Sequence, residues 1–215
     1  IDALEALVQK GVSLIADDKV VVQLYSKGLG IPYLMKLARG ALAKNPSCPS
    51  EILNRLVTDE LESVRGSMAL NPNIAGVLLE RLATDKSWEV RIRSFSNPNM
   101  TADVLERLAM SDNGDVRSSV AAHRSTPVVV LEQLAADKFG SASLTLAGNT
   151  NAPEAVLKNL AVYGTVDVKR NVAYNSSTPA STLEQLALEE HLPSYVLASV
   201  AGNRNTPEAA LERLA

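Results

Sequence analysis

Apolar and polar positions follow one pattern that returns along most of this chain. The pattern Leu-x-x-Leu-Ala begins at Leu79, Leu105, Leu131, Leu157, Leu183 and Leu211, with a near match at Leu53. Successive leucines lie 26 residues apart from Leu53 to Leu183, and 28 apart at the last step. Self-similarity at a fixed period of this size is typical of proteins built from tandem structural repeats.

Two further positions recur with the leucines. A Val-Arg pair or its equivalent follows the leucine by eleven residues in most repeats, as at Val64-Arg65 and Val116-Arg117. An asparagine opens each new block, at Asn45, Asn71, Asn97, Asn149, Asn175 and Asn203, and His123 takes this position once. The repeats therefore begin at residues 45, 71, 97, 123, 149, 175 and 203, and the last one is incomplete. The two extra residues of the preceding repeat lie within LEEHLPS.

Each repeat predicts two short helices. In STPVVVLEQLAAD, Thr126 suits the N-cap of the first helix and Pro127 suits its first helical position. Leu131 and Leu134 then share one apolar face with the alanine that follows. A polar turn leads to a second helix near the Val-Arg pair, where Val116 and its partner four residues on share a face. Glycine in the equivalents of this helix weakens it, and we expect short α or 3₁₀ geometry there.

A repeat of this size cannot bury its own apolar face, so neighbouring repeats must pack together as an all-α solenoid. Residues 45–215 should hold six full repeats and a partial seventh. Residues 1–44 are expected to form an N-terminal helical cap, with helices in 1–18 and 19–28. Its Leu34-Met-Lys-Leu37-Ala38 stretch predicts a shortened repeat. A HEAT-like solenoid is the alternative architecture, although its units are usually longer.

The repeat resembles a known family in several positions at once. The segments NSSTPASTLEQLA and DVRSSVAAH are similar to the repeats of the bacterial leucine-rich repeat variant family, over roughly residues 45–215. The resemblance implies alternating α and 3₁₀ helices, no strands and a right-handed superhelix. Family members can carry a cysteine-rich N-terminal segment with an iron–sulfur cluster. Cys48 is the one cysteine here, so we expect no cluster and no other cofactor.

Composition agrees with closely packed helices. Apolar residues make up 46% of the chain and aromatic residues only 4%, so the core should consist of Leu, Val and Ala. No apolar run of about 18 residues is present and the start lacks a signal-peptide pattern, so we expect a soluble, cytoplasmic chain without a membrane partner. A net charge of −3 argues against a dedicated polyanion binder.

The chain offers few residues for catalysis. His123 is expected to replace the asparagine at a helix end, and His191 should lie in an exposed loop. No glycine-rich phosphate loop, metal-spaced Cys/His cluster or nucleophile elbow is present in the sequence. We therefore expect a protein that is not an enzyme, with no catalytic, cofactor-binding or metal-binding residues.

Charge gives the candidate binding residues. The eight-residue segments that begin at each Val-Arg pair contain six cations and no acidic residue, whereas glutamates recur beside the leucines. The six cations are Arg65, Arg91, Arg93, Arg117, Lys169 and Arg170. The surface is therefore expected to separate by sign. Trp88 is expected in a turn between helices, as a binding anchor or as a partly covered loop residue.

Two interpretations of the recurring cation remain open. In the structural one, it pairs with a turn carboxylate such as Asp59 or Asp85, or with helix-end carbonyls of the adjacent repeat. In the functional one, Arg65, Arg91 and their equivalents stack once per repeat into a basic stripe that binds phosphates or an acidic peptide. Ser143 and Leu197 interrupt that stripe, and most repeats lack the aromatic residues that stack on bases.

These patterns favour a non-enzymatic scaffold that presents an extended surface to a protein or peptide partner. Nucleic-acid binding through the basic stripe and a purely structural spacer role are the alternatives. The last repeat stops at Ala215 after its first helix, which leaves an apolar face without a following unit. We therefore expect the protein to continue, or residues 203–215 to dock on another domain or form a homodimer.

Overall fold

The computed structural model describes residues 31–136 and 142–215. These residues form fourteen α-helices, and no strand occurs among them, which confirms the expected all-α class. None of the described helices combines the length and the apolar character needed to cross a bilayer. The two helices expected within residues 1–28 lie outside the described residues.

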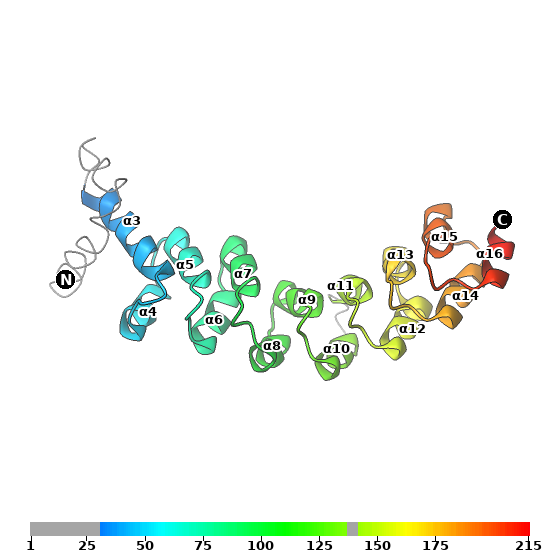
Figure 1. The fold of residues 1–215 in the computed structure, drawn as a ribbon, viewed down its shortest axis with the longest axis horizontal. Helices are drawn as coiled ribbons and strands as arrows, with labels where there is room; N and C mark the ends of the chain where they lie inside the picture. The colour runs from blue at the N-terminus through cyan, green and yellow to red at the C-terminus, as the bar shows by residue number, and fades with distance from the viewer. Residues whose placement is uncertain (1–30, 137–141) are drawn as a thin grey trace. The chain divides into compact units, whose positions relative to one another are not determined.

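The chain divides into two compact units, residues 1–100 and 101–215. In the first, α5 packs against α3 and α7, while α4 and α6 both contact α5 (Figure 1). The helices are α3 (Ile31–Lys44), α4 (Ser50–Leu56), α5 (Glu62–Ala69), α6 (Gly76–Ala83) and α7 (Trp88–Phe95). α4 and α6 are thus first helices of their repeats, and α5 and α7 are second helices.

The second unit has the same arrangement over more repeats. Its first helices contact one another in order, and its second helices form a row of their own (Figure 1). The first helices are α8 (Ala102–Ala109), α10 (Val128–Ala135), α12 (Glu154–Tyr163), α14 (Ala180–Leu188) and α16 (Glu208–Leu214). The second helices are α9 (Gly114–Ala122), α11 (Ser143–Gly148), α13 (Val166–Tyr174) and α15 (Ser194–Ala201).

The core consists of the residues that define the repeat. The recurring leucine is fully buried at Leu79, Leu105, Leu131, Leu157 and Leu183. On the second helices, valines four residues apart are buried together, as at Val116 and Val120 or Val168 and Val172. Small apolar side chains on both helices let the repeats approach closely, so the low aromatic content is compatible with a dense core.

Of the two geometries expected for the second helix, short α or 3₁₀, the described residues adopt the α form, so the alternation of α and 3₁₀ helices implied by the resemblance is not seen there. The reason lies in the spacing of the buried valines. A 3₁₀ helix aligns residues three apart, whereas residues four apart share a face in an α-helix. Burying both Val116 and Val120 in one core therefore requires the α form.

The Thr-Pro pair starts the first helix differently from the prediction. Pro127, Pro179 and Pro207 are the N-cap residues themselves, without a side-chain cap bond. The threonine before each proline is buried and donates its hydroxyl backwards to a valine carbonyl six residues earlier. These bonds are Thr126 to Val120 (2.5 Å), Thr178 to Val172 (2.6 Å) and Thr206 to Val200 (2.5 Å). Each threonine thus fixes the loop to the end of the second helix.

α3 has the place of a second helix, not of a shortened repeat. Arg39 pairs with Asp59 at 3.3 Å, twenty residues ahead, as Arg65 does with Asp85. In this register Ala38 and Arg39 are the equivalent of the Val-Arg pair, and the Leu34–Ala38 stretch extends α3 from this pair towards its N-terminus. The Leu-x-x-Leu-Ala match at Leu34 therefore does not mark a first helix.

Candidate functional site

In five repeats, the recurring asparagine joins its repeat to the one before it. Asn175 donates from Nδ2 to the carbonyls of Ala147 (2.8 Å) and Asn149 (2.9 Å), 28 and 26 residues earlier. The same pair of bonds occurs at Asn71, Asn97, Asn149 and Asn203. Its role is to satisfy carbonyls at the end of the preceding second helix and in the loop that follows it, as expected for a structural residue.

The other side of the same amide shapes the loop. Asn175 Oδ1 accepts a bond from the backbone N–H of Ser177 at 2.9 Å. At position 123, the ring Nδ1 of His123 accepts from Ser125 N at 3.2 Å. His123 is the residue that ends α9, so it occupies the asparagine position as predicted. His191 lies exposed in the turn before α15, with a φ of 73°.

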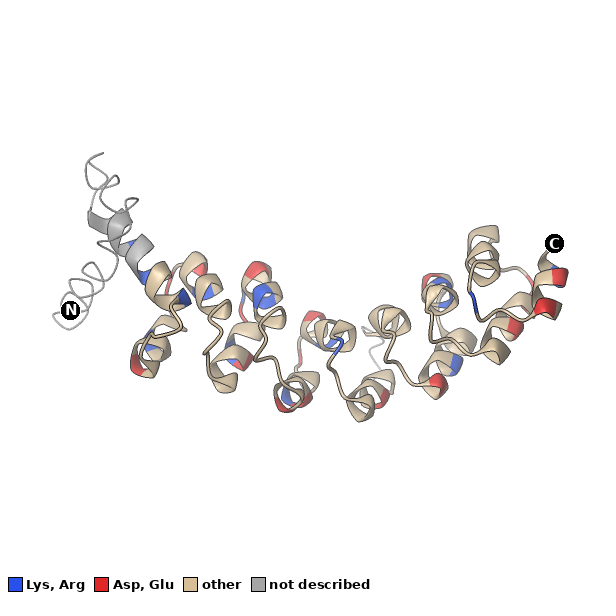
Figure 2. Ribbon diagram, in the orientation of Figure 1, with Lys and Arg blue, Asp and Glu red and all other residues tan. Residues whose placement is uncertain are grey.

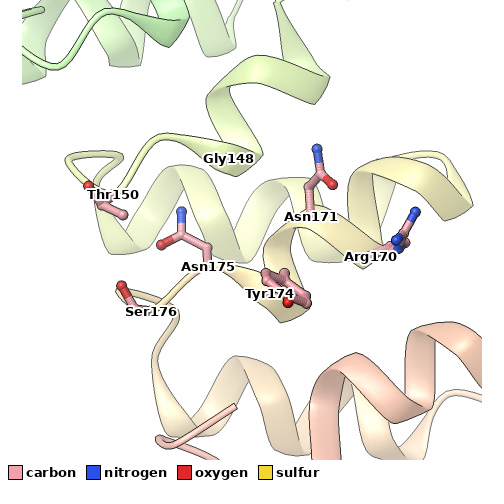
Figure 3. A pocket seen from close by; sticks show the side chains of 7 residues that line it. All are labelled: Gly148, Thr150, Arg170, Asn171, Tyr174, Asn175 and Ser176. Atoms are coloured by element: carbon pink, nitrogen blue, oxygen red, sulfur yellow. The ribbon is translucent and has the colours of Figure 1, made fainter. Parts of the chain in front are cut away.

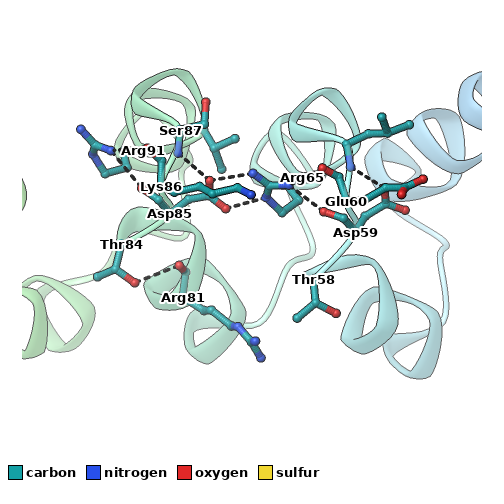
Figure 4. A network of polar contacts seen from close by, with 12 residues as sticks. Thr58, Asp59, Glu60, Arg65, Arg81, Thr84, Asp85, Lys86, Ser87 and Arg91 are labelled. Carbon is teal, nitrogen blue, oxygen red and sulfur yellow. Dashed lines mark hydrogen bonds and ion pairs between the residues drawn. The ribbon is translucent and has the colours of Figure 1, made fainter.

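The recurring arginine is buried and bonded at the first complete site. Arg65 is only 4% exposed. Its Nε and Nη2 donate to the two carboxylate oxygens of Asp85 at 2.6 and 2.9 Å (Figure 4). Its Nη1 donates to the carbonyls of Asp59 at 2.6 Å and Glu60 at 3.2 Å. One guanidinium therefore connects the turn of its own repeat with the turn of the next.

The equivalent cations make similar bonds. Arg91 Nη1 donates to the carbonyls of Asp85 and Lys86 at 2.9 and 3.2 Å (Figure 4), and Arg117 Nη1 donates to those of Ser111 and Asp112. Lys169 pairs with Glu189. The four cations proposed as a regular basic stripe are thus bonded within the fold, which supports the structural interpretation for them.

The pairing with Asp59 and Asp85 was predicted from the sequence, but its constant offset of twenty residues was not. A basic residue is followed by an acidic one twenty positions later at Arg39 and Asp59, at Arg65 and Asp85, and at Lys169 and Glu189. Where the basic residue is absent, at Ser143, position 163 is an uncharged tyrosine. Comparing successive repeats position by position would have shown this offset.

The remaining candidates lie at the surface or near it. Arg93 pairs with Glu89 one helical turn earlier in α7. Arg170 is exposed, and its guanidinium lies 5.9 Å from the ring centroid of Tyr195. Trp88 was predicted to lie in a turn, and this is wrong because Trp88 is the first residue of α7. Its side chain is 66% exposed. The polar turn before α7 is shorter than the sequence suggested.

The expected separation of charge by sign does not hold along the second helices. All of them except α11 begin before their Val-Arg position, and the first turn carries an acidic residue in several of them (Figure 2). These residues are Glu62, Glu89, Asp115 and Asp167. A carboxylate there interacts favourably with the positive end of the helix dipole. Acidic side chains therefore lie at the start of these helices, and the acid-free part is confined to their later turns and the loops that follow.

A groove opens in the second unit between α11 and α13. It measures about 440 Å³ and is lined by Gly148, Thr150, Arg170, Asn171, Tyr174, Asn175 and Ser176. Thr150 and Ser176 lie towards one end and Arg170 towards the other, with Tyr174 between them (Figure 3). Of the residues proposed from sequence, Arg170 alone lines this groove. Tyr174 departs from the repeat pattern and was not proposed.

The described residues contain no group of three or more His, Cys, Asp or Glu arranged to hold a metal ion. Burial raises the pKa of the Cys48 thiol. Comparisons with protein-family models, curated proteins and solved structures found no match to this chain. The groove and the bonded cations are therefore interpreted from their own geometry.

The Arg65–Asp85 pair predicts a pH dependence of stability. Burial acts to raise the pKa of Asp85, but hydrogen bonds from Arg65 and from Ser87 N–H, with the Arg65 charge, lower it overall. The stabilisation is then complete above the unfolded pKa of about 4 and is lost as pH falls towards the lower folded value. We expect urea denaturation to show that the free energy of unfolding declines between pH 6 and about pH 2.5, and that this decline is smaller in Asp85→Asn. The exposed Asp103→Asn is the control, and an equal decline in both variants would contradict the assignment.

Proposed function

We propose that this chain is a non-enzymatic scaffold that binds a protein or peptide partner through its second helices. In this proposal the 26-residue two-helix repeats form a right-handed α-solenoid of the leucine-rich repeat variant type. The resemblance of the repeats supports that assignment. The bonds at a constant offset of 26 and 28 residues support stacking of equivalent units within each part of the chain.

One observation supports protein binding above the others. The second helices expose large apolar and aromatic side chains over 47% to 77% of their area. They are Trp88, Ile92, Leu144, Tyr174 and Tyr195. Tyrosine and tryptophan are enriched at the centres of protein interfaces because they bury a large area with little loss of side-chain freedom. Exposure of such residues from a rigid helical framework suits recognition of another chain.

Nucleic-acid binding through the basic stripe has less support. Arg65 is buried against Asp85, and Lys169 is paired with Glu189. Neutralised cations release few counterions from a phosphate backbone, so they add little affinity. A spacer role would leave the exposed aromatic side chains without a purpose.

The proposal is tested by selecting from a phage library of random 12-residue peptides on the purified chain. We expect peptides that bind in solution and keep most of their affinity between about 50 and 200 mM salt, because an apolar contact is not screened. A labelled 12-residue oligothymidylate and a duplex of equal length are measured beside them. Failure to select any peptide, together with nucleic-acid binding that falls steeply with salt, would overturn the proposal.

A further inference from the structure

The groove beside Tyr174 results from a difference between neighbouring repeats. Tyr174 is the last residue of α13 and is 77% exposed. The equivalent positions in the repeats on either side are glycines, Gly148 and Gly202. α13 packs between α11 and α15. Gly148 is the last residue of α11, and Gly202 follows α15 as its C-cap. The Tyr174 ring thus protrudes between two positions without side chains. The groove that results beside it can hold a ligand.

Gly148 keeps the groove open. A Cβ placed on this residue would meet no atom within 4 Å, so the space beside it is not filled by the protein. On the far side of α13, Tyr195 of α15 is 49% exposed, with the Arg170 guanidinium near its ring face. Tyr174, Arg170 and Tyr195 therefore form one continuous exposed surface over two adjacent helices.

One arginine lies in a loop on each side of this surface. Arg124, Thr150, Ser176 and Arg204 occupy equivalent positions in four consecutive loops. Hydrogen bonds link these loops in order, since Asn151 Nδ2 donates to Arg124 O, Ser177 Oγ to Thr150 O and Asn205 Nδ2 to Ser176 O. Thr150 and Ser176 line the groove, so Arg124 and Arg204 lie one repeat to either side of it.

Arg124 and Arg204 have no acidic residue in their own loops, while Arg170 lies one helical turn after Asp167 on α13. Arg124, Arg170 and Arg204 are exposed, and no ion pair joins them to an acidic residue in the described part of the second unit. The later turns of the second helices and the loops that follow contain no Asp or Glu. These stretches are 116–127, 142–153, 168–179 and 196–207. The surface has a positive charge although the whole chain has a net charge of −3.

We propose that the groove of Gly148, Arg170 and Tyr174, with Arg124 and Arg204 at its ends, binds an extended acidic peptide segment. This inference rests on the proposed function and names the partner chemistry. Helices packed about 8–10 Å apart place the end cations roughly 25–30 Å from each other. An extended peptide of about eight or nine residues spans that distance, at about 3.3 Å per residue.

A peptide fits this surface better than a single-stranded nucleic acid. Two of the four equivalent loop positions, Thr150 and Ser176, are uncharged, whereas a nucleic acid has a phosphate at every step. Arg170 also covers a face of the Tyr195 ring and so competes with a stacking base. An acidic peptide needs carboxylates only near the three arginines, and its apolar side chains can contact the tyrosines.

The test uses the peptides selected from the random library on the full chain. We expect Asp and Glu to be enriched among them, and the tightest one is synthesised with a fluorescein label for anisotropy titration. Tyr174→Ala, Arg170→Glu and Gly148→Leu should each weaken its binding about tenfold or more, as loss of a central contact does. Gly148→Leu fills open space and Tyr174 is exposed, so both variants should keep their helical content.

Matched controls separate the groove from general effects of the substitutions. Tyr163→Ala removes a tyrosine that is 81% exposed at the end of α12, and Arg213→Glu reverses an exposed charge on α16. Both should bind the peptide within about twofold of the parent chain. Selected peptides that are not acidic, or that bind all five variants equally, would overturn this inference and leave the scaffold proposal intact. Binding of oligothymidylate with no selected peptide would overturn both.

Discussion

Replacement of Arg65 with alanine is expected to lower the free energy of unfolding by about 3 to 5 kcal/mol, the usual effect of removing one partner from a buried ion pair. The change leaves the Asp85 carboxylate, which is nearly buried, without its bidentate partner. It also leaves the carbonyls of Asp59 and Glu60 without the Nη1 donor. The measurement is urea denaturation followed by circular dichroism at pH 7.

Arg93→Ala is the matched control for this prediction. Arg93 lies on the neighbouring second helix and pairs with Glu89 on a half-exposed surface. Removing an exposed helical ion pair of this kind should change stability by about 0.5 kcal/mol or less. The double variant of Arg65 and Asp85, each changed to alanine, should recover part of the loss because no buried charge remains. A loss below about 1 kcal/mol for Arg65→Ala would contradict the assigned role.

Replacement of Asn175 with alanine should cost about 2 to 4 kcal/mol, because three backbone groups lose their partner together. Asn175 is buried, donates to Ala147 and Asn149, and accepts from Ser177 N–H. The exposed Asn159 of α12 makes no such bonds, and Asn159→Ala should alter stability by about 0.5 kcal/mol or less.

Asn175→Asp gives a sharper form of the same test. Aspartate keeps the oxygen that accepts from Ser177 N–H, but it replaces the donating amide with a charged oxygen facing two carbonyls. At pH 7 this variant should therefore be less stable than Asn175→Ala, and the order should reverse or narrow at low pH as the carboxylate gains a proton. Equal stability of the aspartate and asparagine forms at pH 7 would show that the donated bonds contribute nothing.

The periodic features were predictable from sequence. The buried leucines, the two helices per repeat and the asparagine at the end of the second helix each recur many times, so a single pattern reports them all. The N-cap position and the start of α7 at Trp88 were not predictable, because they depend on which residue of a short polar stretch first takes up helical geometry. The direction of the Thr178 hydroxyl depends on a contact with the preceding helix.

The groove was missed for a different reason. It is formed by residues that break the pattern, a tyrosine at position 174 where the repeats on either side have glycine. The positions that the repeats share define the common pattern, and a residue that occurs in one repeat only, such as Tyr174, is not part of it. The structure reveals the difference because it places Gly148 and Tyr174 on packed helices, where both line one groove.

The constant offset of the asparagine bonds determines how a chain of this kind can change in length. Asn203 donates to carbonyls 30 and 28 residues earlier, where the other repeats span 28 and 26. The two additional residues lie in the turn that contains His191, and both bonds survive. Duplication of a complete 26-residue block would likewise leave every asparagine facing the same two carbonyls. Genes for such chains can therefore grow by whole modules, while smaller insertions are tolerated at the turn between the two helices of a repeat.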